Sequence, residues 1–177
     1  MRWFWIDRFV EFHRGTKAVA VKAVNFGSDA LTDELPGFPI LPNSLIVEGL
    51  AQTGGLLIGE FRGFRERVVL AKIVKAEFHF PATPGMVLTY TASVQDIRND
   101  GAYCLGRSMM GDRVQAEVEL MFAHLDERNQ RALFEPAEFL RLLRMLRLFD
   151  VGIKEDGSPL DVPDHLLEAE RRLLEPT

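Results

Sequence analysis

The sequence has 177 residues, of which 47% are hydrophobic and 27% charged, and its formal net charge is −5. This size suits one globular domain with a sizeable core and a small appendage, and the acidic balance argues against a nucleic-acid binder, which needs a basic excess. The single cysteine, Cys104, excludes an internal disulfide and fits a reducing cytoplasm. Charged residues interrupt the aromatic N-terminus, so we expect no signal peptide and no membrane span.

The first predicted element is a β-hairpin, because apolar and polar side chains partly alternate on both sides of Gly15. Residues 26–43 follow without periodicity and contain Pro36, Pro39 and Pro42. Each proline removes a backbone donor and disfavours helix in the residue before it. We therefore expect an irregular but stiffened loop.

A long buried helix is predicted next, from Asn43 or Ser44, either of which is a suitable N-cap, to about Arg62. Its apolar residues occupy every side, which indicates that protein surrounds the helix. Glycines in a helix cost about 1 kcal/mol each relative to alanine, so four of them suggest the close approach of another backbone. They are Gly49, Gly54, Gly55 and Gly59.

Four β-rich runs come after the helix, separated by the turn sequences PATPG, NDG and GD. The order predicts an α+β fold in which a curled antiparallel sheet wraps one long helix. After about residue 126 the pattern changes, and residues 136–149 predict one amphipathic helix with Pro136 near its first turn. We expect a main domain of residues 1–126 and a C-terminal helical extension of residues 127–177.

One face of the predicted central helix carries two polar side chains. Glu48 lies in the first turns, where the helix dipole favours an anion by up to about 1 kcal/mol. Gln52 is four residues further on and therefore shares that face. Glu48 is either a structural cap or ion-pair partner, or a candidate acid or base beside the proline-rich loop.

The stretch LPGFPILPNSLIVEGLAQTGG, residues 35–55, resembles the signature of the β-hydroxyacyl-(acyl carrier protein) dehydratases, which have the hot-dog fold. In that family a His-Phe-Pro loop, a second proline-containing turn and a helix bearing Glu-Ala-Met-Ala-Gln follow in this order. The later KAEFHFPATPGMVL is similar to the family's strand and Pro-Gly turn, so the resemblance covers about residues 1–125. The residues that match at matching spacing are Pro36, Gly37, Pro39, Pro42, Glu48, Ala51 and Gln52.

The resemblance implies a homodimer or dimer of dimers with acyl tunnels at the interface, and no metal or organic cofactor. The implied substrate is a 3-hydroxyacyl thioester of acyl carrier protein or coenzyme A in fatty-acid metabolism. Glu48, supplied by the other subunit, would assist the departure of the β-hydroxyl as water, with Gln52 one turn away, and backbone N–H groups near the helix start would polarise the carbonyl. The implied substrate-binding residues are Phe38, Pro39, Pro42, Gly49 and His79.

The loop histidine of the family is replaced here by Glu34, and a glutamate with a pKa of about 4.3 is a much weaker base than imidazole. Three interpretations stay open. Glu34 and Glu48 form a carboxylate and carboxylic acid pair that divides the base and acid roles; Glu48 alone serves a thioesterase; or the chain is a non-catalytic acyl-binding or partner subunit. His79 is either a substitute base or simply a strand residue.

Three arginines, Arg141, Arg144 and Arg147, lie at three-residue spacing on the predicted C-terminal helix. They form the solvated edge of a helix packed on its own domain, a docking surface for an acidic acyl carrier protein, or a contact with a membrane surface. The remaining histidines have no ligand spacing for a metal.

Overall fold

The computed structural model describes residues 4–25, 39–125 and 135–174. The strands are β1 (Arg8–His13), β2 (Lys17–Ala23), β3 (Arg67–Phe78), β4 (Val87–Ile97), β5 (Gly101–Met110), β6 (Arg113–Leu125) and β7 (Gly152–Ile153). The helices are α1 (Asn43–Phe61), α2 (Pro136–Met145), α3 (Leu148–Val151) and α4 (Asp164–Leu174).

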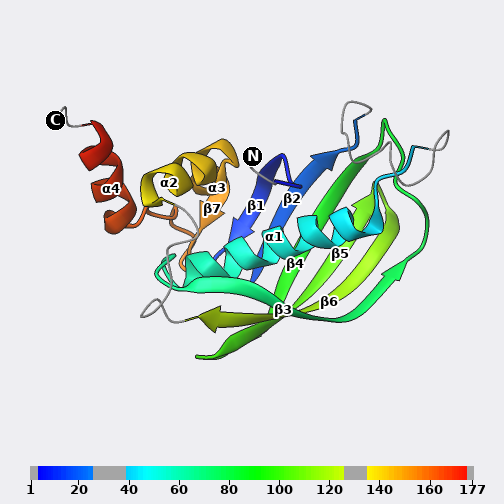
Figure 1. The fold of residues 1–177 in the computed structure, drawn as a ribbon, viewed down its shortest axis with the longest axis horizontal. Helices are drawn as coiled ribbons and strands as arrows, with labels where there is room; N and C mark the ends of the chain where they lie inside the picture. Colours follow the sequence, from blue (N-terminus) through cyan, green and yellow to red (C-terminus); the bar gives the residue numbers. More distant parts are fainter. Residues whose placement is uncertain (1–3, 26–38, 126–134, 175–177) are drawn as a thin grey trace.

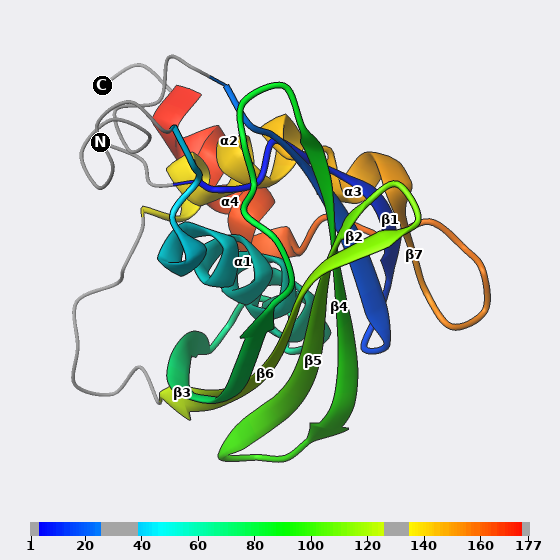
Figure 2. The same ribbon diagram turned by 90° about the vertical axis from the view of Figure 1, so that its right-hand side faces the viewer.

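The seven strands form one sheet in the order β3-β6-β5-β4-β2-β1-β7. Neighbouring strands are antiparallel, except that β7 runs parallel to β1. The sheet curls around α1, which lies on its concave side (Figures 1 and 2). The predicted arrangement of a long helix wrapped by a curled antiparallel sheet is therefore confirmed. None of the described helices is long and apolar enough to cross a membrane.

Helix α1 begins where the proline-rich segment ends. Pro42 occupies the N-cap position with an extended backbone, and no side chain caps the helix, so the expected cap by Asn43 or Ser44 is wrong. The carbonyl of Pro42 accepts hydrogen bonds from the N–H groups of Leu45 and Ile46 at 2.9 and 3.3 Å. The fixed φ of proline is compatible with this position. Because Pro42 is the N-cap, Asn43 is the first helical residue.

Close backbone approach explains the most crowded glycine of α1. A Cβ atom on Gly49 would lie 2.4 Å from Cε2 of Tyr90 and 3.0 Å from the carbonyl oxygen of Trp5. At Gly54 the nearest atoms are the sulfur of Cys104 and the ring of Phe122, both at 3.3 Å. The predicted approach of another backbone is thus confirmed at Gly49 alone, whereas the other three glycines face side chains. The contact at Gly49 holds the N-terminal half of α1 against β4.

The C-terminal extension packs on the β1 side of the sheet (Figure 1). The predicted single helix over residues 136–149 is wrong, because α2 ends at Met145 and Arg147 has a left-handed φ of 60° before α3 begins. The break allows Leu146 and Leu148 to be buried together, which two residues at this spacing cannot achieve on one helix face. The predicted domain boundary at residue 126 lies outside the described residues.

The two edges of the sheet differ. On one side β7 pairs with β1, matching Phe12 with Gly152. On the other side, within the described part of the chain, β3 pairs with β6 alone. Strand β3 is largely exposed, including Leu70, Ile73 and Val74 at 37%, 46% and 44% of their surface. One edge is therefore covered, and the other offers backbone and apolar side chains to a partner.

Candidate active site

Glu48 and Gln52 lie on the same face of α1, as predicted. Nε2 of Gln52 donates a hydrogen bond to Oε1 of Glu48 at 2.9 Å, and the backbone N–H of Trp5 donates to Oε1 of Gln52 at 2.8 Å. The backbone bond fixes which way the amide faces, so its N–H group points at the carboxylate. Both side chains belong to residues that are only partly buried.

Glu48 has no counter-ion within the described ranges, since no lysine, arginine or histidine there lies within 4.0 Å of its carboxylate. This holds for one subunit, so the pairing of Glu48 with a basic residue across an interface stays a prediction. A carboxylate held by a neutral amide alone retains an oxygen that can accept or donate a proton. This is the arrangement expected of an acid or base rather than of a structural salt bridge.

An open cleft of about 570 Å³ lies at the N-terminal end of α1. Two of the predicted substrate-binding residues, Pro42 and His79, line it. The first N–H groups of a helix have no partner within the helix, and they lie at the positive end of its dipole. A carbonyl oxygen placed there would be polarised. The cleft is lined by Ile40, Pro42, Asn43, Ser44, Phe78, His79, Phe80 and Pro81.

His79 lies in the cleft wall, and its imidazole is close to the carboxylate of Glu117. Nε2 of His79 is 3.6 Å from Oε2 of Glu117, and Oε1 of Glu117 also accepts a hydrogen bond from Arg107 at 2.8 Å. The hydrogen bond from Arg107, with a smaller contribution from His79, lowers the pKa of the Glu117 carboxyl. The role of His79 as a substitute base stays a prediction.

The remaining predicted site residues are placed as follows. Gly49 faces Tyr90 and the backbone of Trp5, where it permits close packing. Pro39 begins the second described segment. Glu34 and Phe38 lie outside the described residues, so the predicted pair of Glu34 with Glu48 stays a prediction. In the described part of the chain, no group of three His, Cys, Asp or Glu side chains could hold a metal ion.

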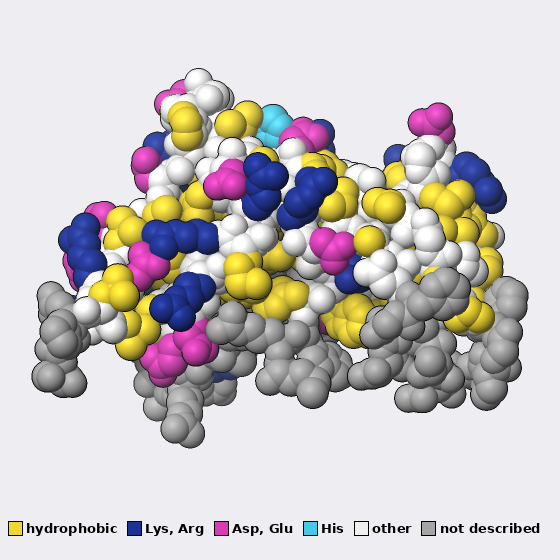
Figure 3. All heavy atoms as spheres, turned by 90° about the horizontal axis from the view of Figure 1, so that it is seen from above, with side chains coloured by type: hydrophobic (Ala, Val, Ile, Leu, Met, Phe, Trp, Pro, Cys, Tyr) yellow, Lys and Arg dark blue, Asp and Glu magenta, His cyan; other side chains and the backbone are white. Residues whose placement is uncertain are grey.

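The predicted arginine surface is partly neutralised by the chain itself. Arg144 pairs with Glu170 of α4, and Nε of Arg147 is 3.1 Å from Asp150, whereas Arg141 is exposed. Where the C-terminal helices lie, at the left of Figure 3, basic and acidic side chains are neighbours. These pairs favour the interpretation of a solvated helix edge. Docking of a carrier protein there stays a prediction.

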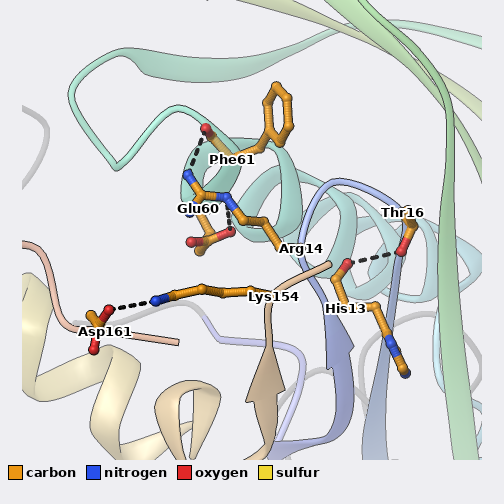
Figure 4. A network of polar contacts seen from close by, with 7 residues as sticks. All are labelled: His13, Arg14, Thr16, Glu60, Phe61, Lys154 and Asp161. Carbon is orange, nitrogen blue, oxygen red and sulfur yellow. Dashed lines mark hydrogen bonds and ion pairs between the residues drawn. The ribbon is translucent and has the colours of Figure 1, made fainter. Parts of the chain in front are cut away.

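A second carboxylate, Glu60 at the C-terminal end of α1, was missed by reasoning from the sequence. Its side chain is only 7% exposed, and Oε2 lies 3.7 Å from Nε of Arg14. Lys154, which is bonded to Asp161 at 2.6 Å, approaches from the segment after β7 (Figure 4). Burial raises the pKa of the Glu60 carboxyl, and the charges of Arg14 and Lys154 oppose this rise. The sequence did offer one indication that Glu60 is unusual: it is an acid at the C-terminal end of a helix, where the helix dipole disfavours a negative charge.

Comparisons with known proteins agree with this geometry. A family model described as the FabA-like domain matches residues 3–119. The 3-hydroxyacyl-(acyl-carrier-protein) dehydratase FabZ of Koribacter versatilis is 38% identical over 115 residues, covering 64% of this chain and 74% of the relative. The FabZ of Desulforamulus reducens is 32% identical over 119 residues, covering 67% of this chain and 84% of the relative.

Solved structures share the fold at low sequence identity. The protein smu.793 of Streptococcus mutans, solved with bound acetyl CoA, has a TM-score of 0.58 and 12% identity, covering 73% of this chain and 96% of its own. The thioesterase HI1161 of Haemophilus influenzae has a TM-score of 0.55 and 13% identity, covering 67% and 78%. The predicted hot-dog fold and the predicted dehydratase relatives are both confirmed. The chain belongs to the FabA-like family.

Proposed function

We propose that the chain is a 3-hydroxyacyl-thioester dehydratase of the FabZ type, acting on acyl groups attached to acyl carrier protein. The observation that carries the proposal is Glu48, a partly exposed carboxylate without a counter-ion among the described residues, which receives one oriented hydrogen bond from Gln52. The names of the relatives support the same reaction. Glu48 also stands at the family's carboxylate position, as the spacing from Pro36 and Pro42 indicates.

In the proposed reaction a base removes the proton next to the thioester carbonyl, and the β-hydroxyl leaves as water when Glu48 donates a proton to it. A Cα–H bond and a Cβ–O bond break, and a carbon–carbon double bond forms. The N–H groups at the start of α1, at Asn43 and Ser44, stabilise negative charge on the carbonyl oxygen. We assign the base role to Glu34, paired with Glu48 so that one carboxyl is charged and the other protonated.

The proposal includes a homodimer formed through β3, with the site completed at the interface. Support comes from the single pairing of β3 within the described chain and from its exposed apolar residues, Leu70, Ile73 and Val74. Two copies joined at this edge would form one continuous sheet. Light scattering coupled to gel filtration measures the mass, and a monomer at micromolar concentration would contradict this part.

The test follows the hydration of a 2-enoyl thioester by the wild type, Glu48→Gln and Glu34→His. We expect an active wild type and a large loss in Glu48→Gln, with Glu60→Gln as the matched control because it removes a carboxylate from the same helix. If the wild type is inert and Glu34→His gains activity, native dehydratase function is ruled out. If Glu48→Gln equals an active wild type, the assignment of Glu48 is wrong.

The alternatives have their own readouts. Release of free thiol from a panel of acyl thioesters, lost in Glu48→Gln, would replace the dehydratase with a thioesterase. Absence of both reactions, together with co-purification of a related subunit, would identify a non-catalytic partner.

A further inference from the structure

One residue of the cleft wall, Phe80, is in contact with a basic side chain that the proposed reaction does not use. Arg113, the first residue of β6, places its guanidinium carbon 4.4 Å from the ring centroid of Phe80. Phe80 in turn lines the cleft. The guanidinium therefore lies on an aromatic ring that belongs to the wall of the candidate active site.

The charge of Arg113 is left uncompensated. No carboxylate in the described part of the chain, including the adjacent Asp112, lies within ion-pair distance of it. Nearby cations of the sheet are neutralised, since Arg107 pairs with Glu117 at 2.8 Å and Lys75 with Glu77 at 3.0 Å. Arg113 is thus a positive charge that rests on a cleft residue, Phe80, and is available to an anion.

The backbone of Phe80, the residue beneath Arg113, is held by strand β6. Nε2 of Gln115 donates to the carbonyl oxygen of Phe80 at 2.9 Å, and the carbonyl of Gln115 accepts from the N–H of His79 at 2.9 Å. Gln115 is fully buried, and its amide N–H group uses the Phe80 carbonyl as its acceptor. Stacking on the ring of Phe80 limits the freedom of the guanidinium and so reduces the entropy lost when it binds a ligand.

We propose that Arg113 binds the phosphate of the phosphopantetheine arm on which the acyl thioester is carried. This inference rests on the proposed function, because it takes the acyl thioester to occupy the cleft. A planar guanidinium presents two parallel N–H donors that match two phosphate oxygens. The arm has the thioester at one end and the phosphate at the other, and both acyl carrier protein and coenzyme A present it.

The test measures binding by calorimetry, with two non-reactive thioether analogues that carry the same acyl group. One is attached to phosphopantetheine and the other to pantetheine, which lacks the phosphate. We expect the wild type to bind the phosphorylated analogue about five- to ten-fold more tightly, the size of one charge-assisted contact in a partly solvated site. Arg113→Gln should lose this preference and keep its affinity for pantetheine, and added salt should reduce the preference.

Arg98→Gln is the matched control, because Arg98 is exposed at the β4–β5 turn and already paired with Asp96. It should keep the preference. Equal binding of both analogues by the wild type, no measurable binding of either, or an equal loss for both in Arg113→Gln would overturn the inference. Unchanged affinity for pantetheine in Arg113→Gln also shows that the cleft remains folded.

Kinetics with thioesters of the two natural carriers test whether Arg113 recognises the phosphate or the surface of the carrier protein. Arg113→Gln should raise KM for coenzyme A thioesters and for carrier-protein thioesters alike, because both contain the same phosphate. A loss confined to the carrier protein would place Arg113 against the protein surface and overturn the phosphate assignment. Since the analogues need no turnover, an inert chain that still prefers the phosphorylated analogue would refute the proposed reaction and support the phosphate site.

Discussion

The two ends of α1 each carry a glutamate, and the surroundings of these two side chains are opposite. Glu48 is partly exposed in the first turns of α1, whose first residues line the open cleft, and the neutral amide of Gln52 is its hydrogen-bond donor. Glu60 is almost fully enclosed and faces two cations, Arg14 and Lys154. Burial alone would select Glu60 as the unusual carboxylate. Partial exposure and the lack of a counter-ion among the described residues select Glu48, and these are properties that a reacting group needs.

The largest effect expected is a difference in activity between variants of the two carboxylates: Glu48→Gln should lose activity and Glu60→Gln should keep it. Glu48→Gln should lower the rate of enoyl-thioester hydration by about 10²- to 10⁴-fold, the usual contribution of a positioned acid or base. Its melting temperature should stay near that of the wild type, because no ion pair within the described chain is lost. Glu60→Gln should keep the rate within a few-fold. Hydration rates and thermal melts of the same preparations measure both properties.

A loss of activity of similar size in both variants would remove the distinction between the two ends. So would an unfolded Glu48→Gln, since Glu48 would then be structural. Glu48→Asp should have an activity between those of the wild type and Glu48→Gln, because it keeps the carboxylate but moves it away from Nε2 of Gln52.

The next effect concerns how firmly the N-terminal half of α1 is fixed. Gly49→Ala should destabilise the protein by about 1–3 kcal/mol, because the new methyl group overlaps the ring of Tyr90 and overpacking costs energy of this order. Gly55→Ala is the matched change on the same helix. Its methyl group would meet Phe122 at an ordinary 3.5 Å, so helix propensity should stabilise the protein by up to about 1 kcal/mol.

Urea unfolding of the two alanine variants measures the difference in free energy. If Gly49→Ala is as stable as Gly55→Ala, the helix can shift away from β4, and the position of Glu48 is not fixed by packing.

The smallest effect is in the dependence of stability on pH. Burial raises the pKa of Glu60 above its ordinary 4.5 in the folded state. The folded protein then holds this proton at pH values where the unfolded chain has released it. The stabilisation is complete below the unfolded pKa and is lost as the pH rises through the folded value. Relative to the wild type, Glu60→Gln should therefore gain stability between pH 4 and pH 8.

Melting temperatures across that range, compared between the wild type and Glu60→Gln, give the result. A difference that stays constant with pH, or that moves against the variant, would show that Arg14 and Lys154 outweigh burial. Glu48→Gln, measured in parallel, is the control for pH effects on the melting temperature that do not depend on Glu60.

The central helix and the strands around it could be predicted because their signals are local. Apolar residues on all sides of residues 43–61, and turn sequences between β-rich runs, indicated both the elements and their order. The pairing of Glu48 with Gln52 followed from four-residue spacing on a helix. The cytoplasmic location and the domain boundary stay predictions.

Features that depend on contacts distant in the sequence could not be predicted. The break at Arg147 follows from burying both Leu146 and Leu148, and the carbonyl of Leu146 accepts a hydrogen bond from Phe9 of β1. The enclosure of Glu60 requires the β1–β2 turn and the segment after β7 to meet at one helix end. The stacking of Arg113 on Phe80 likewise joins β6 to the segment after β3 through tertiary contact.

Strand β7 is only two residues long, yet it bears on how the proposed dimer could assemble. A sheet with two open edges can add copies at both and grow into a fibre, whereas a sheet with one open edge can join a single partner. By pairing with Phe12 and His13, Gly152 and Ile153 occupy the β1 edge and leave β3 as the other. In the dimer proposed through β3, the C-terminal extension would thus prevent a second copy from pairing with β1.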